Sequence, residues 1–347
     1  MKSRRIIGYD VIRIFSAFVV VAYHFASTAS AKNGWASFPY FFNYQGKSWG
    51  GTAVGLFFIL SGAAIAMTHD FELNRRNILQ FYWTRAKKLY PMFWMAFSYI
   101  YIQNVVMNHS FFYFGKPWLL LLSFFGVDGY FNYMGRTYYL IGEWFLGAII
   151  LVYLLYPVIL FCFHRMRYVT LAVLILLAYL NQLNVFGLKI PFQQNILTCC
   201  LLFYAGMLFE RIRLKVTQYS WIFGPAAIAG MIYLLAWPTD IPIELCTLVM
   251  SFVMFVALFC IGSWISLAGP IEYAAVGLSG LTYPVFLLQH QIINWACKSF
   301  AEFSLTQVQE FWLLVMVFLL TLVYAWILKM ISLKLSGRLV IRKRSVQ

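Results

Sequence analysis

Charged residues are scarce in this chain of 347 residues, because only 11% of them are Asp, Glu, Lys or Arg. A soluble domain carries about 25% charged residues. The chain is instead 63% hydrophobic and 20% aromatic. This composition excludes an ordinary soluble fold and predicts an all-α polytopic transmembrane helical bundle.

Acidic residues are scarcer still, with 11 Asp and Glu against 26 Lys and Arg, which gives a net charge of +15. Such an excess can indicate nucleic-acid binding, but basic residues of a membrane protein gather in its cytoplasmic loops. We therefore expect no nucleic-acid partner. The six cysteines form no C-x-x-C pair and no zinc-type spacing with histidine, so we expect packing cysteines and no metal. We also expect no cleavable signal peptide, because the first apolar run is too long and contains charges.

Ten apolar segments are long enough to cross a hydrocarbon core of about 30 Å. They are Ile6–Ala26, Gly51–Met67, Leu89–Val106, Tyr138–Phe163, Tyr168–Leu183, Pro191–Phe209, Trp221–Trp237, Ile243–Ile265, Ala274–Cys297 and Phe311–Ile331. An eleventh stretch, Trp118–Val127, is too short to span and is expected to be interfacial or re-entrant. Ten spans with both termini cytoplasmic place most Lys and Arg on the inner side, as the positive-inside rule requires. We expect a transmembrane domain over residues 1–335 and a basic cytoplasmic tail over 336–347.

The first apolar run contains four polar side chains that are costly in lipid: Tyr9, Asp10, Arg13 and His24. Arg13 and His24 are eleven residues apart, so on a helix they lie within roughly 20° of each other and about 16 Å apart. The spacing predicts one polar stripe that faces protein or water. Alternatively, the first three residues only anchor the helix at the membrane surface. A span over Ile12–Ala31 would then leave Arg13 at the surface and His24 near mid-depth.

Four further residues are candidates for chemistry. Arg85 and Lys88 are i, i+3 neighbours on a helix and would form a pair of cations suited to phosphate, although they also fit ordinary topology-setting charge. Glu143 is expected about a turn and a half inside the fourth span, where an acid needs a partner. His290 lies in the outer half of the ninth span, and taken alone it is more typical of a packing histidine. The small residues of Gly50–Gly62 favour close helix packing, and Ser61 is not in a G-x-S-x-G elbow.

These motifs together resemble the acyltransferase-3 family of membrane proteins. Tyr9-Asp10-x-x-Arg13 followed by His24 is similar to the family's first-helix signature, and Gly55–Gly62 resembles its second-helix motif. Arg85-x-x-Lys88 resembles its Arg-x-x-Arg motif, with lysine in place of the second arginine. The remaining similarity lies in Glu143-Trp144-Phe145, Tyr153–Pro157 and Tyr283–His290. The resemblance thus extends over residues 9–290.

The resemblance implies an integral membrane O-acyltransferase that moves an acetyl or other short acyl group from cytoplasmic acyl-CoA to a hydroxyl of a cell-surface or exported carbohydrate. We expect acetyl-CoA as a co-substrate and no permanently bound cofactor. The expected partners are acyl-CoA, a carbohydrate or glycolipid acceptor and membrane lipid. The expected location is the bacterial plasma (inner) membrane. A polytopic transporter or flippase is the alternative, although no repeated half with matching broken helices is seen. A non-catalytic membrane scaffold or receptor would leave His24 and the pair Arg85 and Lys88 unexplained.

We therefore assign roles as hypotheses. Arg13, Arg85 and Lys88 would hold the CoA phosphates. His24 would be the general base for the acceptor hydroxyl, with Glu143 orienting its ring, and an acyl-histidine intermediate stays open. Asp10 would pair with Arg13 and fix its direction, while Tyr9 and His290 support the site.

Overall fold

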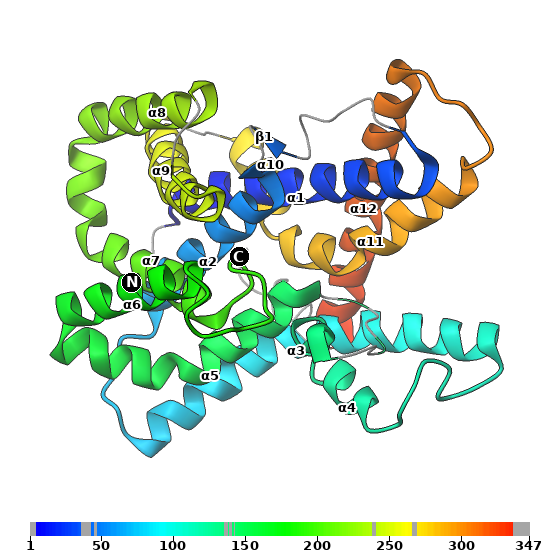
Figure 1. The fold of residues 1–347 in the computed structure, drawn as a ribbon, viewed down its shortest axis with the longest axis horizontal. Helices are drawn as coiled ribbons and strands as arrows, with labels where there is room; N and C mark the ends of the chain where they lie inside the picture. The colour runs from blue at the N-terminus through cyan, green and yellow to red at the C-terminus, as the bar shows by residue number, and fades with distance from the viewer. Residues whose placement is uncertain are drawn as a thin grey trace, which may run out of the picture. The chain divides into compact units, whose positions relative to one another are not determined.

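The computed structural model describes residues 5–35, 43–44, 47–134, 138, 141, 143–237, 241–265 and 269–335. This part of the chain is almost entirely helical (Figure 1). Its only strands are β1 (Asn43–Tyr44) and β2 (Lys47–Ser48), which form one short antiparallel pair. The predicted all-α membrane fold is therefore confirmed.

Each predicted span overlaps at least one helix of the structure. The helices are α1 (Ile7–Asn33), α2 (Trp49–Thr68), α3 (Arg75–Asn108), α4 (Leu119–Phe124), α5 (Glu143–Arg165), α6 (Arg167–Gln182), α7 (Ile196–Gln218), α8 (Ser220–Ala236), α9 (Ile243–Trp264), α10 (Pro270–Ser279), α11 (Thr282–Ser299) and α12 (Gln307–Leu335), with a 3-10 turn η2 (Tyr130–Met134). The stretch Trp118–Val127 contains only the six-residue α4, which is too short to span. Among the described helices, five are long and apolar enough to cross a membrane, or up to seven if each bent pair is one span. Ten spans with cytoplasmic termini stay a prediction.

Several predicted boundaries differ from those of the helices. The helix of the sixth segment begins at Ile196 rather than at Pro191. The ninth segment, Ala274–Cys297, is not one helix, because α10 ends at Ser279 and α11 begins at Thr282. Pro284 explains the break, since it has no N–H to donate to the carbonyl of Gly280 in a continuous helix. The fourth segment begins at Glu143 rather than at Tyr138, so Glu143 stands at the helix N-terminus and not inside the helix. An acid is favourable there because the helix dipole is positive at that end.

The chain divides into two compact units. The first unit comprises Met1–Ser27, Phe38–Tyr82 and Ala148–Ser279. The second unit comprises Thr28–Ser37, Trp83–Gly147 and Gly280–Gln347. Because α1, α3 and α5 each contribute to both units, the candidate site residues are also divided between them.

In the first unit, α2 packs against α7 and α9 through small residues, and α8 lies beside α9 (Figure 1). A Cβ atom at Gly62 in α2 would overlap the carbonyl oxygen of Phe203 in α7. A Cβ atom at Gly206 in α7 would in turn overlap the carbonyl oxygen of Ile59 in α2. The two backbones therefore touch, as glycines allow in membrane helix pairs, and the expected role of the glycine-rich second helix is confirmed.

In the second unit, α11 packs against α12, and α3 is held by hydrogen bonds from aromatic side chains. The Trp94 indole in α3 donates to the carbonyl of Phe124 in α4 at 3.0 Å. The Tyr283 hydroxyl in α11 donates to the carbonyl of Leu89 in α3 at 3.0 Å. These bonds satisfy the polar atoms of aromatic residues that are otherwise suited to an apolar environment.

Candidate functional site

Part of the polar stripe of α1 is buried against protein, whereas Arg13 and His24 are half-buried. Tyr9 and Asp10 are 2% and 3% exposed, and Ser16, between the two ends of the stripe, is fully buried. Phe18 on another side of the helix is 43% exposed, as a lipid-facing residue would be. The helix extends from Ile7 to Asn33, so it contains the register Ile12–Ala31 and all of the register Ile6–Ala26 except Ile6 itself. Burial of Tyr9 and Asp10 argues against a purely superficial anchoring role for these two side chains.

Asp10 is the centre of a hydrogen-bonded cluster. Its carboxylate accepts hydrogen bonds from Arg13 Nη1 at 3.1 Å, from Arg5 Nη2 at 3.0 Å and from Ser279 Oγ at 2.5 Å. The predicted pairing of Asp10 with Arg13 is therefore present. Arg5 and Ser279 were not predicted as partners of Asp10. In the sequence, Arg5 is one of several topology-setting charges, and Ser279 belongs to a distant segment. Two guanidinium groups share one carboxylate, so the cluster of Arg5, Asp10 and Arg13 keeps an excess positive charge.

A second buried contact joins Tyr9 to α7. The Tyr9 hydroxyl donates to the carboxylate of Glu210, which also accepts from Arg213 Nε at 2.9 Å. The Tyr9 ring packs against Phe255 and Phe259 of α9, with ring centroids 6.3 and 5.5 Å away. Glu210 was not predicted as a site residue. The available signal was an acid at the end of an apolar segment in a chain with very few acids.

Glu210 also borders a cavity of about 390 Å³ in the first unit. Asp70, Tyr156, Phe163 and Arg211 contribute to its wall. Arg211 lies with its guanidinium carbon 5.9 Å from the centre of the Phe163 ring. In the predicted orientation this cavity lies toward the cytoplasm, because its residues come from the ends of α2, α5 and α7 that carry the basic links.

His24 lies farther along the same helix and is half-buried. It is eleven residues beyond Arg13, which corresponds to about 16 Å along α1. Its ring meets the Tyr23 ring edge-on, with the centroids 5.2 Å apart. Tyr23 packs so closely on Gly50, at the start of α2, that a Cβ there would lie 2.7 Å from the Tyr23 ring. His24 therefore belongs to a part of α1 that is held against the glycine-rich second helix.

Arg85 and Lys88 are in the second unit, on one continuous helix. Because α3 begins at Arg75, both residues lie within it and are i, i+3 neighbours as expected. Arg85 is half-buried and Lys88 is exposed. The intervening Lys87 lies elsewhere on the helix, with its ammonium 4.6 Å from the centre of the Trp83 ring.

The other two candidates also belong to the second unit. His290 is half-buried in α11, next to the fully buried Gln289. Glu143 is the first residue of α5, and its side chain lies outside the described part of the structure. The structure thus brings Tyr9, Asp10 and Arg13 together on α1, whereas the grouping of His24 with Glu143 stays a prediction.

A comparison with protein families identifies the type of domain. Residues 6–330 match the acyltransferase-3 family model, whose description is "Acyltransferase domain". Searches of curated proteins and of solved structures found no match. The matched region includes Tyr9, Asp10 and all the other candidate site residues, whereas Arg5 lies just before it.

Proposed function

Because the chain belongs to the acyltransferase-3 family and is a multi-pass membrane acyltransferase, we propose that it moves an acetyl or other short acyl group from cytoplasmic acyl-CoA to a carbohydrate hydroxyl. The observation that carries this proposal is the polar stripe of α1, which is buried at Tyr9, Asp10 and Ser16. The half-buried Arg13 lies near one end of this stripe, and the half-buried His24 lies near the other. Such a stripe gives a polar route through an apolar helix, which a membrane-crossing thioester arm requires. We propose the bacterial plasma membrane as its location.

The donor would bind through its phosphates on the cytoplasmic side. Arg85 and Lys88 present two cations on successive turns of α3, and lysine and arginine both bind phosphate strongly. Arg13 shares Asp10 with Arg5, so this cluster has positive charge to offer as well. The pantetheine arm would then extend along the stripe toward His24.

The acyl transfer itself would use His24 as a general base. The neutral imidazole accepts the proton of the acceptor hydroxyl, and the hydroxyl oxygen attacks the thioester carbonyl carbon. The carbon–sulfur bond breaks, and the leaving CoA thiolate takes the proton back from the imidazolium. The products are the ester and free CoA, so protons and charges balance without any further reactant.

The buried cluster around Asp10 would position this route rather than react. Asp10 fixes the direction of Arg13 through the hydrogen bond at 3.1 Å. Tyr9 links the same turn of α1 to Glu210 in α7. Hydrogen-bonded, buried polar groups of this kind restrict a helix to one rotation, because any other rotation leaves them unsatisfied.

The direct test is release of CoA by the purified full-length protein in the presence of acetyl-CoA and a sugar acceptor, with the acylated sugar identified by mass spectrometry. CoA release that depends on the acceptor would support acyl transfer. The transporter alternative predicts instead that reconstituted vesicles accumulate the saccharide without any acyl-CoA. Accumulation in vesicles without CoA release would reject our proposal.

A further inference from the structure

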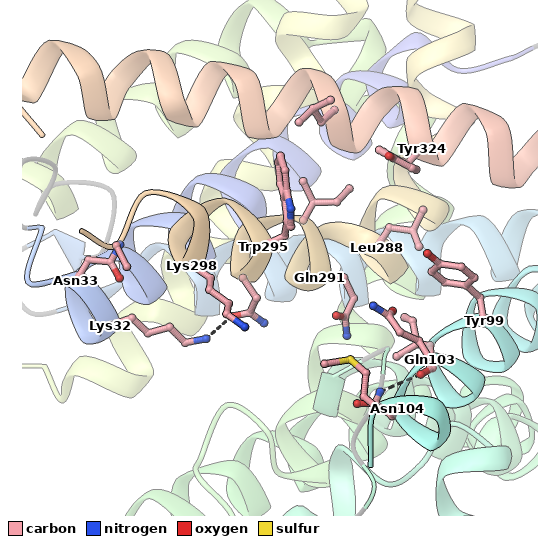
Figure 2. A pocket seen from close by; sticks show the side chains of 16 residues that line it. Lys32, Asn33, Tyr99, Gln103, Asn104, Leu288, Gln291, Trp295, Lys298 and Tyr324 are labelled. Carbon is pink, nitrogen blue, oxygen red and sulfur yellow. Dashed lines mark hydrogen bonds between the residues drawn. The ribbon is translucent and has the colours of Figure 1, made fainter. Parts of the chain in front are cut away.

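The second unit contains a pocket of about 720 Å³, larger than the cavity beside Glu210. It lies between α1, α3, α11 and α12 (Figure 2). Three of these helices end beside it, at Asn33, Asn108 and Ser299. In the predicted orientation these C-terminal ends are on the outer side of the membrane, where an exported carbohydrate would arrive.

The pocket has a charged end. Lys32 in the last turn of α1 and Lys298 in the last turn of α11 both line it, and none of the described residues in its wall is acidic. The Lys32 ammonium donates to the amide oxygen of Asn294 at 2.7 Å, a neutral acceptor. Among the described residues, no ion pair involves Lys32 or Lys298. The two ammonium groups therefore leave an uncompensated positive charge at this end of the pocket.

The other end of the pocket carries amides and aromatic rings. Figure 2 shows Tyr99 and Gln103 of α3 at the end away from Lys32, with Gln291 of α11 facing the space between the two helices. Asn104 donates its Nδ2 to the carbonyl of Ile100 at 2.9 Å, which leaves its amide oxygen to accept. Side-chain amides both donate and accept, so they suit a ring of hydroxyl groups.

Two further rings, Trp295 in α11 and Tyr324 in α12, line the pocket and are 56% and 54% exposed. Flat aromatic faces pack against the C–H faces of sugar rings, while the indole N–H and the phenol O–H are free to bond at the edge. Pockets lined by aromatic rings, with a few polar groups that fix orientation, are the usual form of small-ligand sites.

We propose that this pocket binds the acceptor and that the acceptor is an acidic saccharide whose carboxylate pairs with Lys32 and Lys298. This inference rests on the proposed function, because it names the substrate class for the same transfer. A neutral sugar would use the amides and rings but would leave both cations without a counter-charge. An anionic lipid headgroup is the competing source of negative charge, but it would make no use of several amides beyond the charged end.

A purely structural role for the lysines makes a different prediction. Each is in the last turn of its helix, where a cation is stabilised by the negative end of the dipole. In that case a neutral substitution would lower the unfolding temperature and would not change the preference between acidic and neutral saccharides.

The test measures binding without catalysis, so that it is independent of acyl transfer. The full-length protein is reconstituted in zwitterionic nanodiscs without acyl-CoA. It is titrated with a tetrasaccharide of alternating glucose and glucuronic acid, and with the same tetrasaccharide after reduction of its carboxyl groups. We expect the acidic form to bind roughly tenfold tighter or more, with an affinity that falls as salt is raised, since it depends on charge.

Substitutions then locate the charge. Lys298→Gln and Lys32→Gln should each remove most of this preference, and Lys298→Arg should keep it. Lys189→Gln is the matched control, because Lys189 is exposed, is expected on the outer side and does not line the pocket. The melting curve of each variant checks folding.

Equal binding of the two saccharides, or no binding of either, would overturn the proposal. So would a preference that survives both Lys→Gln changes. A further titration uses nanodiscs containing phosphatidylglycerol. Loss of saccharide binding there, together with phosphatidylglycerol binding that requires Lys298, would identify a lipid site instead. If acceptor-dependent CoA release persists while any of these results is obtained, only the pocket assignment fails and the acyltransferase proposal stands.

Discussion

The hydroxyl of Tyr9 in α1 donates a hydrogen bond to the carboxylate of Glu210 in α7. The next residue, Asp10, binds Arg5, Arg13 and Ser279 instead. Two adjacent side chains of the same helical turn therefore fix α1 to two different parts of the first unit. A buried polar group that loses its hydrogen-bond partner costs free energy of folding, so removing any of these contacts should measurably lower the stability of the protein.

Removing the Tyr9–Glu210 contact should destabilise the protein. Tyr9→Phe and Glu210→Gln should each lower the unfolding temperature in detergent, and their effects should be less than additive because they disrupt the same bond. Each change is expected to cost about 1–3 kcal/mol. Glu272→Gln, at an exposed position in α10, is the control. If the decrease in unfolding temperature of the double variant equals the sum of the two single decreases, the bond contributes no stability.

The glycine contact between α2 and α7 should tolerate no methyl group. Gly62→Ala should reduce stability by about 1–3 kcal/mol, because its Cβ would overlap a backbone carbonyl that cannot rotate away. The same change at Gly277, in α10, has no atom within 4 Å to meet and should be neutral or slightly stabilising. Thermal unfolding of the two variants compares them directly. A Gly62→Ala protein as stable as Gly277→Ala would mean that the helices separate easily.

His24→Ala should abolish acyl transfer without loss of membrane insertion, since a missing general base costs about 10²–10⁴ in rate. His290→Ala should reduce the rate less. The measurement is kcat for acceptor-dependent CoA release at matched protein levels. Activity of His24→Ala within a few-fold of wild type would remove His24 from the mechanism, and equal losses in both variants would place both histidines at the reacting groups.

Lys88 distinguishes phosphate binding from ordinary topology-setting charge. If it binds a CoA phosphate, Lys88→Gln should raise the KM for acetyl-CoA roughly tenfold or more, whereas Lys88→Arg should keep the wild-type value. Arg85→Gln should cost at least as much, because this position keeps the family's arginine. The control is Lys87→Gln, since the Lys87 ammonium lies near the Trp83 ring. Unchanged KM values in both Gln variants, at normal expression, would show that Arg85 and Lys88 serve only as topology-setting charges.

The ten-span topology can be tested with single cysteines. Cysteines at Lys116 and Lys189, both exposed, should react with an impermeant thiol reagent in intact cells. A cysteine at Lys215 should react only after permeabilisation. Lys215 is a better inner position for a cysteine than Arg213, because replacing Arg213 would remove its hydrogen bond to Glu210. The native cysteines are buried or half-buried, so the unsubstituted protein serves as the background. Labelling at Lys215 from outside would reject ten spans.

The sequence by itself determined the class of the protein. Its scarcity of charge requires helices that satisfy their own backbone hydrogen bonds in lipid, and helical periodicity alone places Arg13 and His24 on one side of α1. It also predicted the Asp10–Arg13 pair, because a contact between i and i+3 depends only on helix geometry. The glycines of α2 similarly indicated close packing before any partner helix was known.

Only the tertiary structure decided which distant residues become partners. Glu210 and Ser279 lie 201 and 269 positions from the residues of the Tyr9–Asp10 turn that they contact, and no local pattern names either as a partner. Ser279, which donates to Asp10, is the last residue of α10, directly before the break that precedes α11. The pattern of apolar residues continues across this break and does not predict it. The pocket between α1, α3, α11 and α12 likewise combines Lys32 with Lys298, 266 positions later in the chain. Periodicity reports which face of a helix is buried, whereas packing between helices far apart in sequence determines what that face meets.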